Sequence, residues 1–504
     1  MRVYITVASL LLALCQTVGA APSPGPAARK AADHAVKAYG GAVIESLAAM
    51  VSFNTVADKE VPFERNPQHL GFKKYLKEHA ARLGLDYADH GYVIVIGHGH
   101  SSERVGIITH GDIQPVDPAK WNKSPFELDR TSEPGRLIGR GTEDDKGPIA
   151  TAMYAMKAIK DNKLALSKRI ELYVYMAEES DWAPLAAFLK THKAPQINIT
   201  IDAEYPVVTA EKGWGTVSVT MPAAVPASAA AAETGPFIGA FSGGFFNSQI
   251  PEDASVLVER ATPEIEARIK ARAAGHKGMR YTYSWQGQQL QIAARGVSAH
   301  SSKPQDGVNA ISMLADALKV GEWPNNSAGA LVNFLNDMIG TGIHGQQFGA
   351  IAYSDDFMGP MTFAPTLIKQ SGNGLQLNIN MRRPRGKERA LLESQVRAAL
   401  DAWQAKRVVL ADVTVQISDP WIQEDAPQVP TLLSVFSYYT GITNPQPIAV
   451  GGGTNSRLFP HAVSFGPTMP GTVYSGHSEH EFITTKQLLM NLKMYTAVMV
   501  ELAK

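Results

Sequence analysis

The stretch Val105-Gly106-Ile107-Ile108-Thr109-His110-Gly111-Asp112 joins a β-branched apolar run to two ionisable side chains. Such a run predicts a buried strand, and open α/β sheets bind their ligands at the carboxyl ends of strands. A histidine followed two residues later by a carboxylate suits a metal ligand and a partner that orients the imidazole ring. Taken alone, the pair also fits an ordinary surface histidine beside an aspartate.

Acidic residues follow other predicted strands in the same way. The strand Arg169–Tyr175 leads into Glu178 and Glu179, and the strand Ile197–Asp202 ends at Asp202. A turn at 139–148, framed by Gly139, Gly141 and Gly147, carries the adjacent carboxylates Asp144 and Asp145. Taken alone, the turn and the Glu178–Glu179 pair also fit a helix amino terminus, where acidic side chains are favoured. Adjacent carboxylates in a tight turn, however, favour a bound cation.

The chain outside these motifs alternates between helical and strand patterns. Helices are predicted at 29–53, 66–83, 148–159 and 182–189, with strands at 92–96, 105–109, 169–175 and 197–202. This alternation predicts an α/β domain with a mixed or parallel sheet covered on both faces.

The pattern changes between 212 and 417. An alanine-rich stretch at 223–232 precedes 239–246, which fits a loop or a strand edge. Helices are predicted at 263–273, 306–319 and 387–404, and strands at 280–295 and 374–383. We therefore expect a catalytic domain of two segments, 21–211 and 418–504, interrupted by an inserted α+β lid domain at 212–417.

Composition excludes several classes of protein. The chain has 504 residues, with 47 Lys and Arg against 47 Asp and Glu, so the basic surface of a nucleic-acid-binding protein is not expected. A single cysteine, Cys15, rules out a disulfide framework and a cysteine-rich zinc cluster. Any metal site must therefore use His, Asp and Glu.

The first 20 residues resemble a secretory signal peptide. Arg2 precedes an apolar run, and small residues lead up to Ala20. The apolar run is too short for a membrane-spanning helix, which needs about 20 apolar residues. Cleavage after Ala20 would remove Arg2 and Cys15, leaving a net charge of 47 − 1 − 47 = −1 and no thiol. We expect a secreted or periplasmic protein with no membrane attachment after cleavage.

A histidine at 477, in the segment 476–482, completes a set of candidate ligands after the chain returns to the first domain. Oxygen and nitrogen donors of this kind suit a hydrolytic site with two metal ions, in which one carboxylate bridges the ions and a spare carboxylate accepts a proton. The candidates are His110, Asp144, Glu178, Glu179, Asp202 and His477.

In this order, the motifs resemble the ArgE/DapE/carboxypeptidase G family of co-catalytic zinc peptidases. The resemblance rests on His110-x-Asp112, the 139–147 turn with Asp144, Glu178-Glu179, Asp202 and His477-x-x-x-Glu481, and it covers nearly all of the chain after the signal. Asp202-Ala203-Glu204-Tyr205-Pro206 followed by Glu211-Lys212-Gly213 is most similar to bacterial non-specific dipeptidases of the dipeptidase V type. His480 departs from the family, which usually has Asn there, and could alter the rim of the pocket.

The resemblance implies a role for each matched residue. One zinc ion would be bound by His110 and Asp202, and the other by Glu179 and His477. Asp144 would bridge the two ions. Asp112 would orient His110, and Glu178 would be the general base. In the lid, the segment 296–304 implies that His300 stabilises the oxyanion. The resemblance also implies substrate contacts from Arg382, which would grip the substrate carboxylate, from Asn247 and from the glycine-rich loop at Gly452.

The expected activity is therefore hydrolysis of dipeptides with a free carboxylate, by two divalent ions. Zinc is the expected metal, and manganese and cobalt are the alternatives. Two alternatives from the same family remain open, an N-acyl-amino-acid deacylase and a glutamate-type carboxypeptidase. A secreted binding protein without activity is a third. The large insertion resembles the lid of monomeric dipeptidases, so we expect a monomer.

Overall fold

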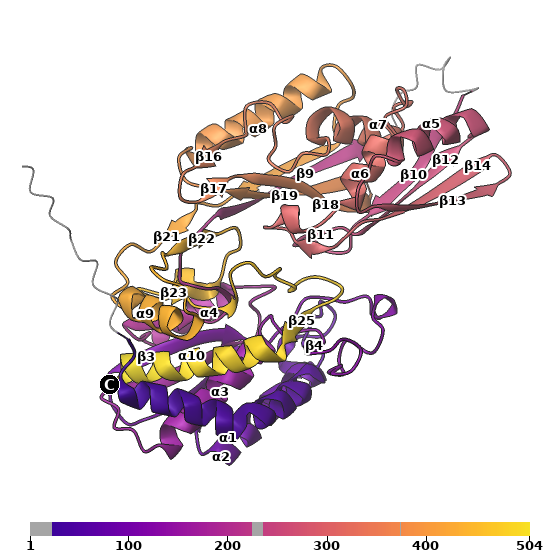
Figure 1. Cartoon of the computed structure of the whole chain (residues 1–504). Helices are drawn as coiled ribbons and strands as arrows, with labels where there is room; N and C mark the ends of the chain where they lie inside the picture. Colours follow the sequence, from indigo (N-terminus) through magenta and orange to yellow (C-terminus); the bar gives the residue numbers. More distant parts are fainter. Residues whose placement is uncertain (1–22, 224–234, 373) are drawn as a thin grey trace, which may run out of the picture.

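The computed structural model describes residues 23–223, 235–372 and 374–504, and it forms two domains (Figure 1). The predicted signal peptide and most of the alanine-rich stretch lie outside the described residues. The first domain comes from both ends of the chain, and the second is inserted between β8, which ends at Glu211, and β21, which begins at Trp421. The expected fold class, an α/β domain with an inserted α+β lid, is confirmed.

A nine-stranded mixed sheet forms the centre of the first domain, in the order β1-β2-β5-β3-β6-β23-β8-β21 with β22 beside β8. The neighbours β5, β3 and β6 are parallel to one another, so their carboxyl ends meet at one edge. The strands are β1 (Asp86–Asp89), β2 (Val93–His98), β3 (Arg104–His110), β5 (Arg169–Tyr175), β6 (Ile197–Thr200), β8 (Val208–Glu211), β21 (Trp421–Ile422), β22 (Ile448–Val450) and β23 (Val463–Ser464).

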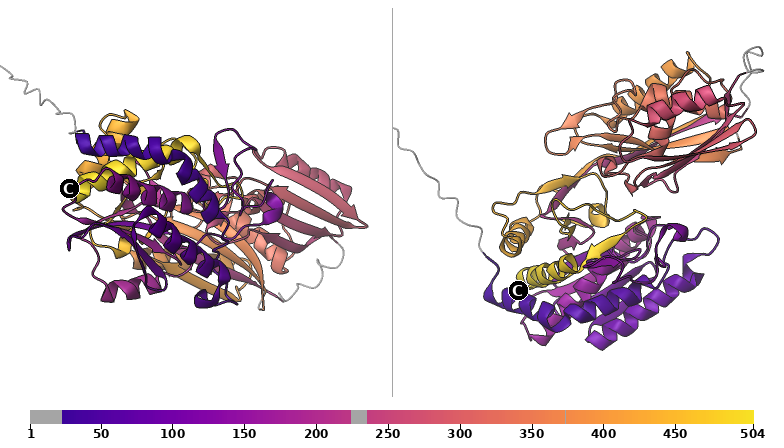
Figure 2. Two further views of the ribbon diagram at one scale, coloured as in Figure 1. Left: turned by 90° about the horizontal axis from the view of Figure 1, so that it is seen from below. Right: turned by 45° about the vertical axis from the view of Figure 1, so that its right-hand side comes forward.

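Helices cover both faces of this sheet because its central strands are apolar on both sides. Ile107 and Leu172 belong to the main core under one layer of helices, whereas Ile108 and Tyr173 belong to a smaller core beneath α4 (Ala183–Thr191). The main layer packs α1 against α10 and α3, which lie side by side in both views of Figure 2. It contains α1 (Pro26–Val51), α2 (Pro67–Leu83), α3 (Lys146–Asp161), α9 (Val429–Thr440) and α10 (Thr485–Ala503).

The second domain, the lid, is an eight-stranded antiparallel sheet in the order β13-β14-β12-β10-β18-β19-β9-β20. Helices α5 (Pro263–Ala273), α6 (Ala310–Ala317), α7 (Ser327–Phe334) and α8 (Arg389–Gln404) pack on one face, uppermost in Figure 1. The strands are β9 (Gly213–Pro222), β10 (Phe237–Gly243), β12 (Asp253–Glu259), β13 (Arg280–Gln286), β14 (Gln289–Arg295), β18 (Thr362–Ser371), β19 (Gly374–Arg383) and β20 (Asp412–Ile417).

Two short strands of the lid lie on the side that faces the first domain. β11 (Gln249–Ile250) pairs with β15 (Ala299–His300) in a two-stranded sheet. Figure 1 shows β11 at the lower face of the lid, opposite the layer of helices. This placement brings His300 towards the carboxyl edge of the first sheet.

Three elements of the lid differ from the sequence-based expectation. The predicted strand 280–295 is a hairpin that turns at Gly287, where φ is +60°. The predicted helix 306–319 begins only at Ala310, because the side chain of Asn309 accepts a hydrogen bond from the backbone N–H of Ser312 and caps it. The sequence favours a loop or a strand edge at 239–246, whereas 237–243 form β10, an inner strand between β12 and β18.

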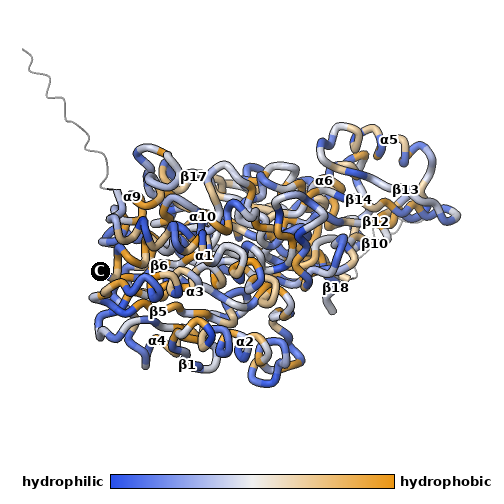
Figure 3. The backbone as a smooth tube through the Cα atoms, turned by 60° about the horizontal axis from the view of Figure 1, so that its bottom comes forward, coloured by the Kyte–Doolittle hydropathy of each residue, from blue (hydrophilic) through white to orange (hydrophobic). Residues whose placement is uncertain are grey.

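The hydropathy of the chain follows these layers. In Figure 3 the hydrophobic segments gather along strands and helices inside each domain, and the outer turns are hydrophilic. No helix among the described residues is both long and apolar enough to cross a membrane.

Candidate metal centre

Three parallel strands bring the first candidate ligands together. His110 is the last residue of β3 and lies opposite Tyr175 at the end of β5, three residues before Glu178. Asp202 follows β6, which pairs with the other side of β3. Adjacent parallel strands that end at the same edge therefore place a histidine and three carboxylates in one region, as expected from the sequence.

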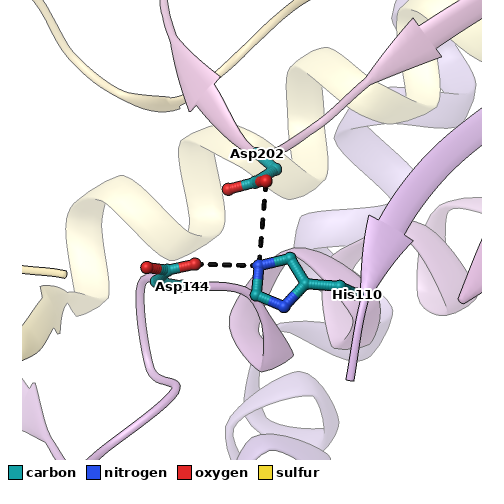
Figure 4. A group of neighbouring side chains, drawn as sticks. All are labelled: His110, Asp144 and Asp202. Carbon is teal, nitrogen blue, oxygen red and sulfur yellow. Dashed lines mark hydrogen bonds and ion pairs between the residues drawn. The ribbon is translucent and has the colours of Figure 1, made fainter. Parts of the chain in front are cut away.

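One group of possible ligands consists of His110, Asp144 and Asp202 (Figure 4). The Nε2 atom of His110 lies 2.9 Å from Oδ1 of Asp144 and 3.7 Å from Oδ2 of Asp202. His110 is only 1% exposed. Its other ring nitrogen, Nδ1, bonds to the main-chain oxygen of Asp112 at 3.0 Å, which leaves Nε2 directed at the two carboxylates.

The second group consists of Asp144, Glu179 and His477. The Nε2 atom of His477 lies 2.9 Å from Oε1 of Glu179 and 3.2 Å from Oδ2 of Asp144. Asp144 thus directs one oxygen at His110 and the other at His477, which is the arrangement of a bridging carboxylate. The donor atoms within each group lie within 4.8 Å of one another. Histidine and carboxylate donors at these distances fit a pair of borderline divalent cations such as zinc.

Asp112 binds the backbone of the next ligand turn rather than only the ring of His110. Its two carboxylate oxygens accept hydrogen bonds from the backbone N–H groups of Glu178 and Glu179, each at 3.0 Å. Oδ1 is 3.6 Å from Nδ1 of His110, whose hydrogen bond goes to the Asp112 carbonyl. Asp112 therefore fixes His110 and the Glu178–Glu179 turn relative to each other.

Burial and neighbouring charges together shift the pKa values of the ionisable groups in this site. Burial raises the pKa of Glu178 well above its ordinary value; the charge of His110 opposes this rise, and Asp202 adds to it. Burial lowers the pKa of His110, but the charge of Asp202 and the hydrogen bonds that the ring donates to the carboxylates of Asp112 and Asp144 raise it well above its usual range. Divalent cations would offset this concentration of buried negative charge.

Two glutamates brace the loops that carry Asp144 and His477. Glu481 accepts hydrogen bonds from Arg140, at 2.9 Å, and from the backbone N–H groups of Gly141, Glu143 and Asp144. In the opposite direction, Glu143 accepts bonds from the backbone N–H (2.7 Å) and the hydroxyl (2.6 Å) of Ser475. The sequence motifs contain both glutamates, but no pattern in the motifs indicates this reciprocal pairing.

His300 reaches the centre from the lid of the same chain. Its ring centroid lies 4.4 Å from that of His477. The backbone N–H of Ser302 donates to Nδ1 of His300 at 3.1 Å, so a neutral ring carries its proton on Nε2. Burial lowers the pKa of His300 well below its ordinary value, and the charges of His477 and Arg382 add to this, so the ring is neutral near pH 7.

The three predicted substrate contacts differ in position. Among the described residues, the cavity beside the metal ligands has Gly452 in its lining but neither Arg382 nor Asn247. Arg382 is 8% exposed, and its Nη2 donates a hydrogen bond to the hydroxyl of Ser301 at 3.4 Å. The side chain of Asn247 accepts a hydrogen bond from Asn378, at 2.9 Å.

Contacts that the motifs did not indicate also form the cavity wall. The hydroxyl of Tyr474 donates to Oδ2 of Asp144 at 2.6 Å. Lys303 of the lid forms a 2.6 Å ion pair with Glu204 of the first domain, so the two domains meet at the cavity. His480 lies elsewhere, paired with Glu133 at 2.7 Å, and is half exposed.

Comparison with known proteins agrees with this geometry. A model of peptidase family M20/M25/M40 matches residues 106–501. The chain belongs to this family. It is therefore a hydrolase of the metallopeptidase class, and the resemblance drawn from the motifs is confirmed.

Relatives and solved structures extend the comparison. The chain is 28% identical to the Beta-Ala-Xaa dipeptidase of Lactobacillus delbrueckii subsp. lactis over 477 residues, which cover 92% of this chain and 96% of the relative. Human carnosine dipeptidase 1 has a similar fold, with a TM-score of 0.57 at 14% identity over 94% of this chain and 99% of that one. The di-peptidase Dug1p from Saccharomyces cerevisiae also has a similar fold, with a TM-score of 0.55 at 12% identity. The match covers 94% of this chain and 98% of that one.

Proposed function

We propose that this metallopeptidase hydrolyses dipeptides that have a free carboxylate, at a centre of two divalent cations. The observation that carries the proposal is the pair of ligand groups that share Asp144, next to Glu178, whose Oε1 atom is buried. His110 and Asp202 would hold one ion, and Glu179 and His477 the other. When bound, such ions polarise a peptide carbonyl and make water more acidic.

Glu178 fits the role of general base. Its Oε1 atom is buried without a hydrogen-bond partner among the described residues, while its backbone N–H is held by Asp112. The free oxygen can therefore take a proton from the attacking water and pass it to the leaving amine. The Nε2–H of His300 can donate to the oxyanion that forms at the scissile carbonyl.

Arg382 supports a substrate with a free carboxylate. Its guanidinium is buried and has hydrogen bonds only to the neutral side chains of Asn380 and Ser301, so no carboxylate among the described residues pairs with it. A buried cation without an anionic partner is costly. A substrate carboxylate would supply that partner, and the relative named a Beta-Ala-Xaa dipeptidase agrees with this choice.

A substrate panel tests the proposal. Purified protein loaded with zinc, manganese or cobalt is assayed on dipeptides, tripeptides, dipeptide amides and N-acyl amino acids, with and without a chelator. We expect chelator-sensitive cleavage of dipeptides above all other substrates. Preferred release of acyl groups or of C-terminal glutamate would instead identify the deacylase or the carboxypeptidase. No hydrolysis of any substrate would favour a binding protein.

We further propose that the protein is exported and works as a monomer. Export rests on the sequence of residues 1–20, and mass spectrometry of the protein recovered after secretion should find an amino terminus at Ala21. A mature protein that retains Met1 would contradict cleavage. The monomer is supported by His300, which reaches His477 within one chain.

A further inference from the structure

Glu211 is a buried carboxylate at the junction of the two domains, and it has no part in the proposed chemistry. It is the last residue of β8 and is 0% exposed. Its Oε1 accepts hydrogen bonds from the backbone N–H of Thr454, at 3.1 Å, and from the Thr454 hydroxyl, at 2.7 Å. Its Oε2 accepts a bond from Nε of Arg457 at 2.6 Å.

Arg457 ties this carboxylate to both connections between the domains. Its Nη2 donates to the main-chain oxygen of Lys212 at 2.7 Å, and its Nη1 donates to that of Asp419 at 3.2 Å. The two connections pack against each other at Gly213, where an added Cβ would lie 2.3 Å from the main-chain oxygen of Ser418. The position of Glu211 is therefore set by both connections at once.

On its other side, Glu211 holds a loop that touches the lid. The loop Gly451–Thr454 lines the cavity through Gly452, Gly453 and Thr454. At Gly451 an added Cβ would lie 2.6 Å from the main-chain oxygen of Ser302, so the loop is in close contact with the lid there. Ser302 is also the residue whose backbone N–H and hydroxyl contact Nδ1 of His300.

We propose that Glu211 is a positioning residue for His300, acting through the Gly451–Thr454 loop and Ser302. The carboxylate fixes the loop to the interdomain connections, and the loop is the surface against which the His300 segment of the lid docks. Without the carboxylate, Thr454 and Arg457 lose their common acceptor, and the loop is free to shift away from Ser302. The inference rests on the proposed function for the role of His300.

The test is a double-mutant cycle on kcat/KM for a dipeptide, with Glu211→Gln, His300→Ala and the double variant. Misplacing a catalytic donor by about 1 Å costs up to about 100-fold, so Glu211→Gln should lower kcat/KM by roughly 10- to 100-fold. Removing the oxyanion donor should cost about 100- to 1,000-fold. If Glu211 acts through His300, the double variant should equal His300→Ala within about twofold.

Glu171→Gln is the matched control. Glu171 is a buried carboxylate of the same domain that accepts from Arg104, at 3.1 Å, and from Arg169, at 3.2 Å, near the start of β5 rather than at its carboxyl end. The Glu171→Gln substitution should leave kcat/KM nearly unchanged. Where Glu211→Gln does not fold, Arg457→Lys replaces it, because lysine keeps the charge but cannot reach both main-chain oxygens. The proposal would be overturned if the double variant lost kcat/KM by the product of the two fold losses of the single variants.

A second readout needs no turnover. In protein labelled with ¹⁵N-histidine, the ring signals of His300 are identified by their absence in His300→Ala. Their chemical shifts should change in Glu211→Gln and stay the same in Glu171→Gln. Unchanged chemical shifts in Glu211→Gln would contradict the positioning role. A wild-type protein that cleaves no dipeptide would refute the proposed function, while this measurement would still decide the role of Glu211.

Discussion

At the scale of single residues, the proposed contact between Arg382 and the substrate carboxylate can be tested by substitution. Replacing Arg382 with methionine keeps an unbranched apolar stem of similar width but removes the guanidinium and its buried charge. Truncating one partner of a buried charge pair costs about 2–5 kcal/mol, so kcat/KM for a dipeptide should fall accordingly. A dipeptide amide, which has no carboxylate to lose, should be cleaved equally slowly by the wild type and the variant. Steady-state kinetics on the matched substrates measures the difference.

The control for this substitution is Arg385→Met, three residues further along the chain. The Arg385 side chain is 46% exposed and pairs with Asp355 away from the cavity. The Arg385→Met substitution should leave kcat/KM unchanged for both the dipeptide and its amide. Equal losses on the acid and the amide in Arg382→Met would show that Arg382 supports the fold rather than the substrate carboxylate.

At the scale of elements, the packing of α1, α2 and α3 contains a histidine that must stay neutral. His79 on α2 is 4% exposed; its Nε2 contacts the hydroxyl of Ser46 on α1 at 3.1 Å, and its ring packs against Tyr154 of α3. Burial lowers the pKa of His79 to about 4, and the charge of Arg82 adds to this.

This histidine predicts a loss of stability in acid. An unfolded histidine has a pKa of about 6.5, so the stabilisation by neutral His79 is complete above that pH and is lost as the pH falls towards 4. His79→Gln cannot be protonated. The free energy of unfolding of the wild type should therefore drop by about 2–3 kcal/mol more than that of the variant between pH 7 and pH 4. Parallel pH profiles from urea unfolding would contradict the prediction.

The ligand-bearing strands could be predicted from the sequence because the signal is local. A β-branched run predicts β3, and the residues directly after β3, β5 and β6 must then lie at one sheet edge. The bracing of Asp144 by Glu481 could not be predicted, since 337 residues separate these partners and no local pattern records the pairing. Tyr474 and the contact between Lys303 and Glu204 depend in the same way on the folded arrangement of loops and domains.

At the scale of the whole molecule, contacts between the domains complete the site within one chain. Lys303 pairs with Glu204, and Lys120 of the first domain pairs with Glu252 of the lid at 3.0 Å. His300 consequently lies beside the His477 of its own chain. This contact within one chain supports the proposal that the protein works as a monomer.

Mixing inactive variants tests this self-sufficiency. His300→Ala and Glu178→Gln each remove a different part of the machinery, and a mixture of the two purified proteins should remain as inactive as the separate proteins. Sedimentation at the assay concentration should give the mass of one chain. Recovery of dipeptide hydrolysis in the mixture would show that His300 acts across a dimer, contrary to the proposal.

We propose that Glu178 activates water beside two cations, and kcat on a dipeptide for Glu178→Gln, with bound metal determined on the same sample, tests this role. The substitution removes the proposed base and none of the five proposed ligands. We expect two equivalents of metal, as in the wild type, and a kcat lower by about 100- to 10,000-fold. An unchanged kcat with metal still bound would contradict this role.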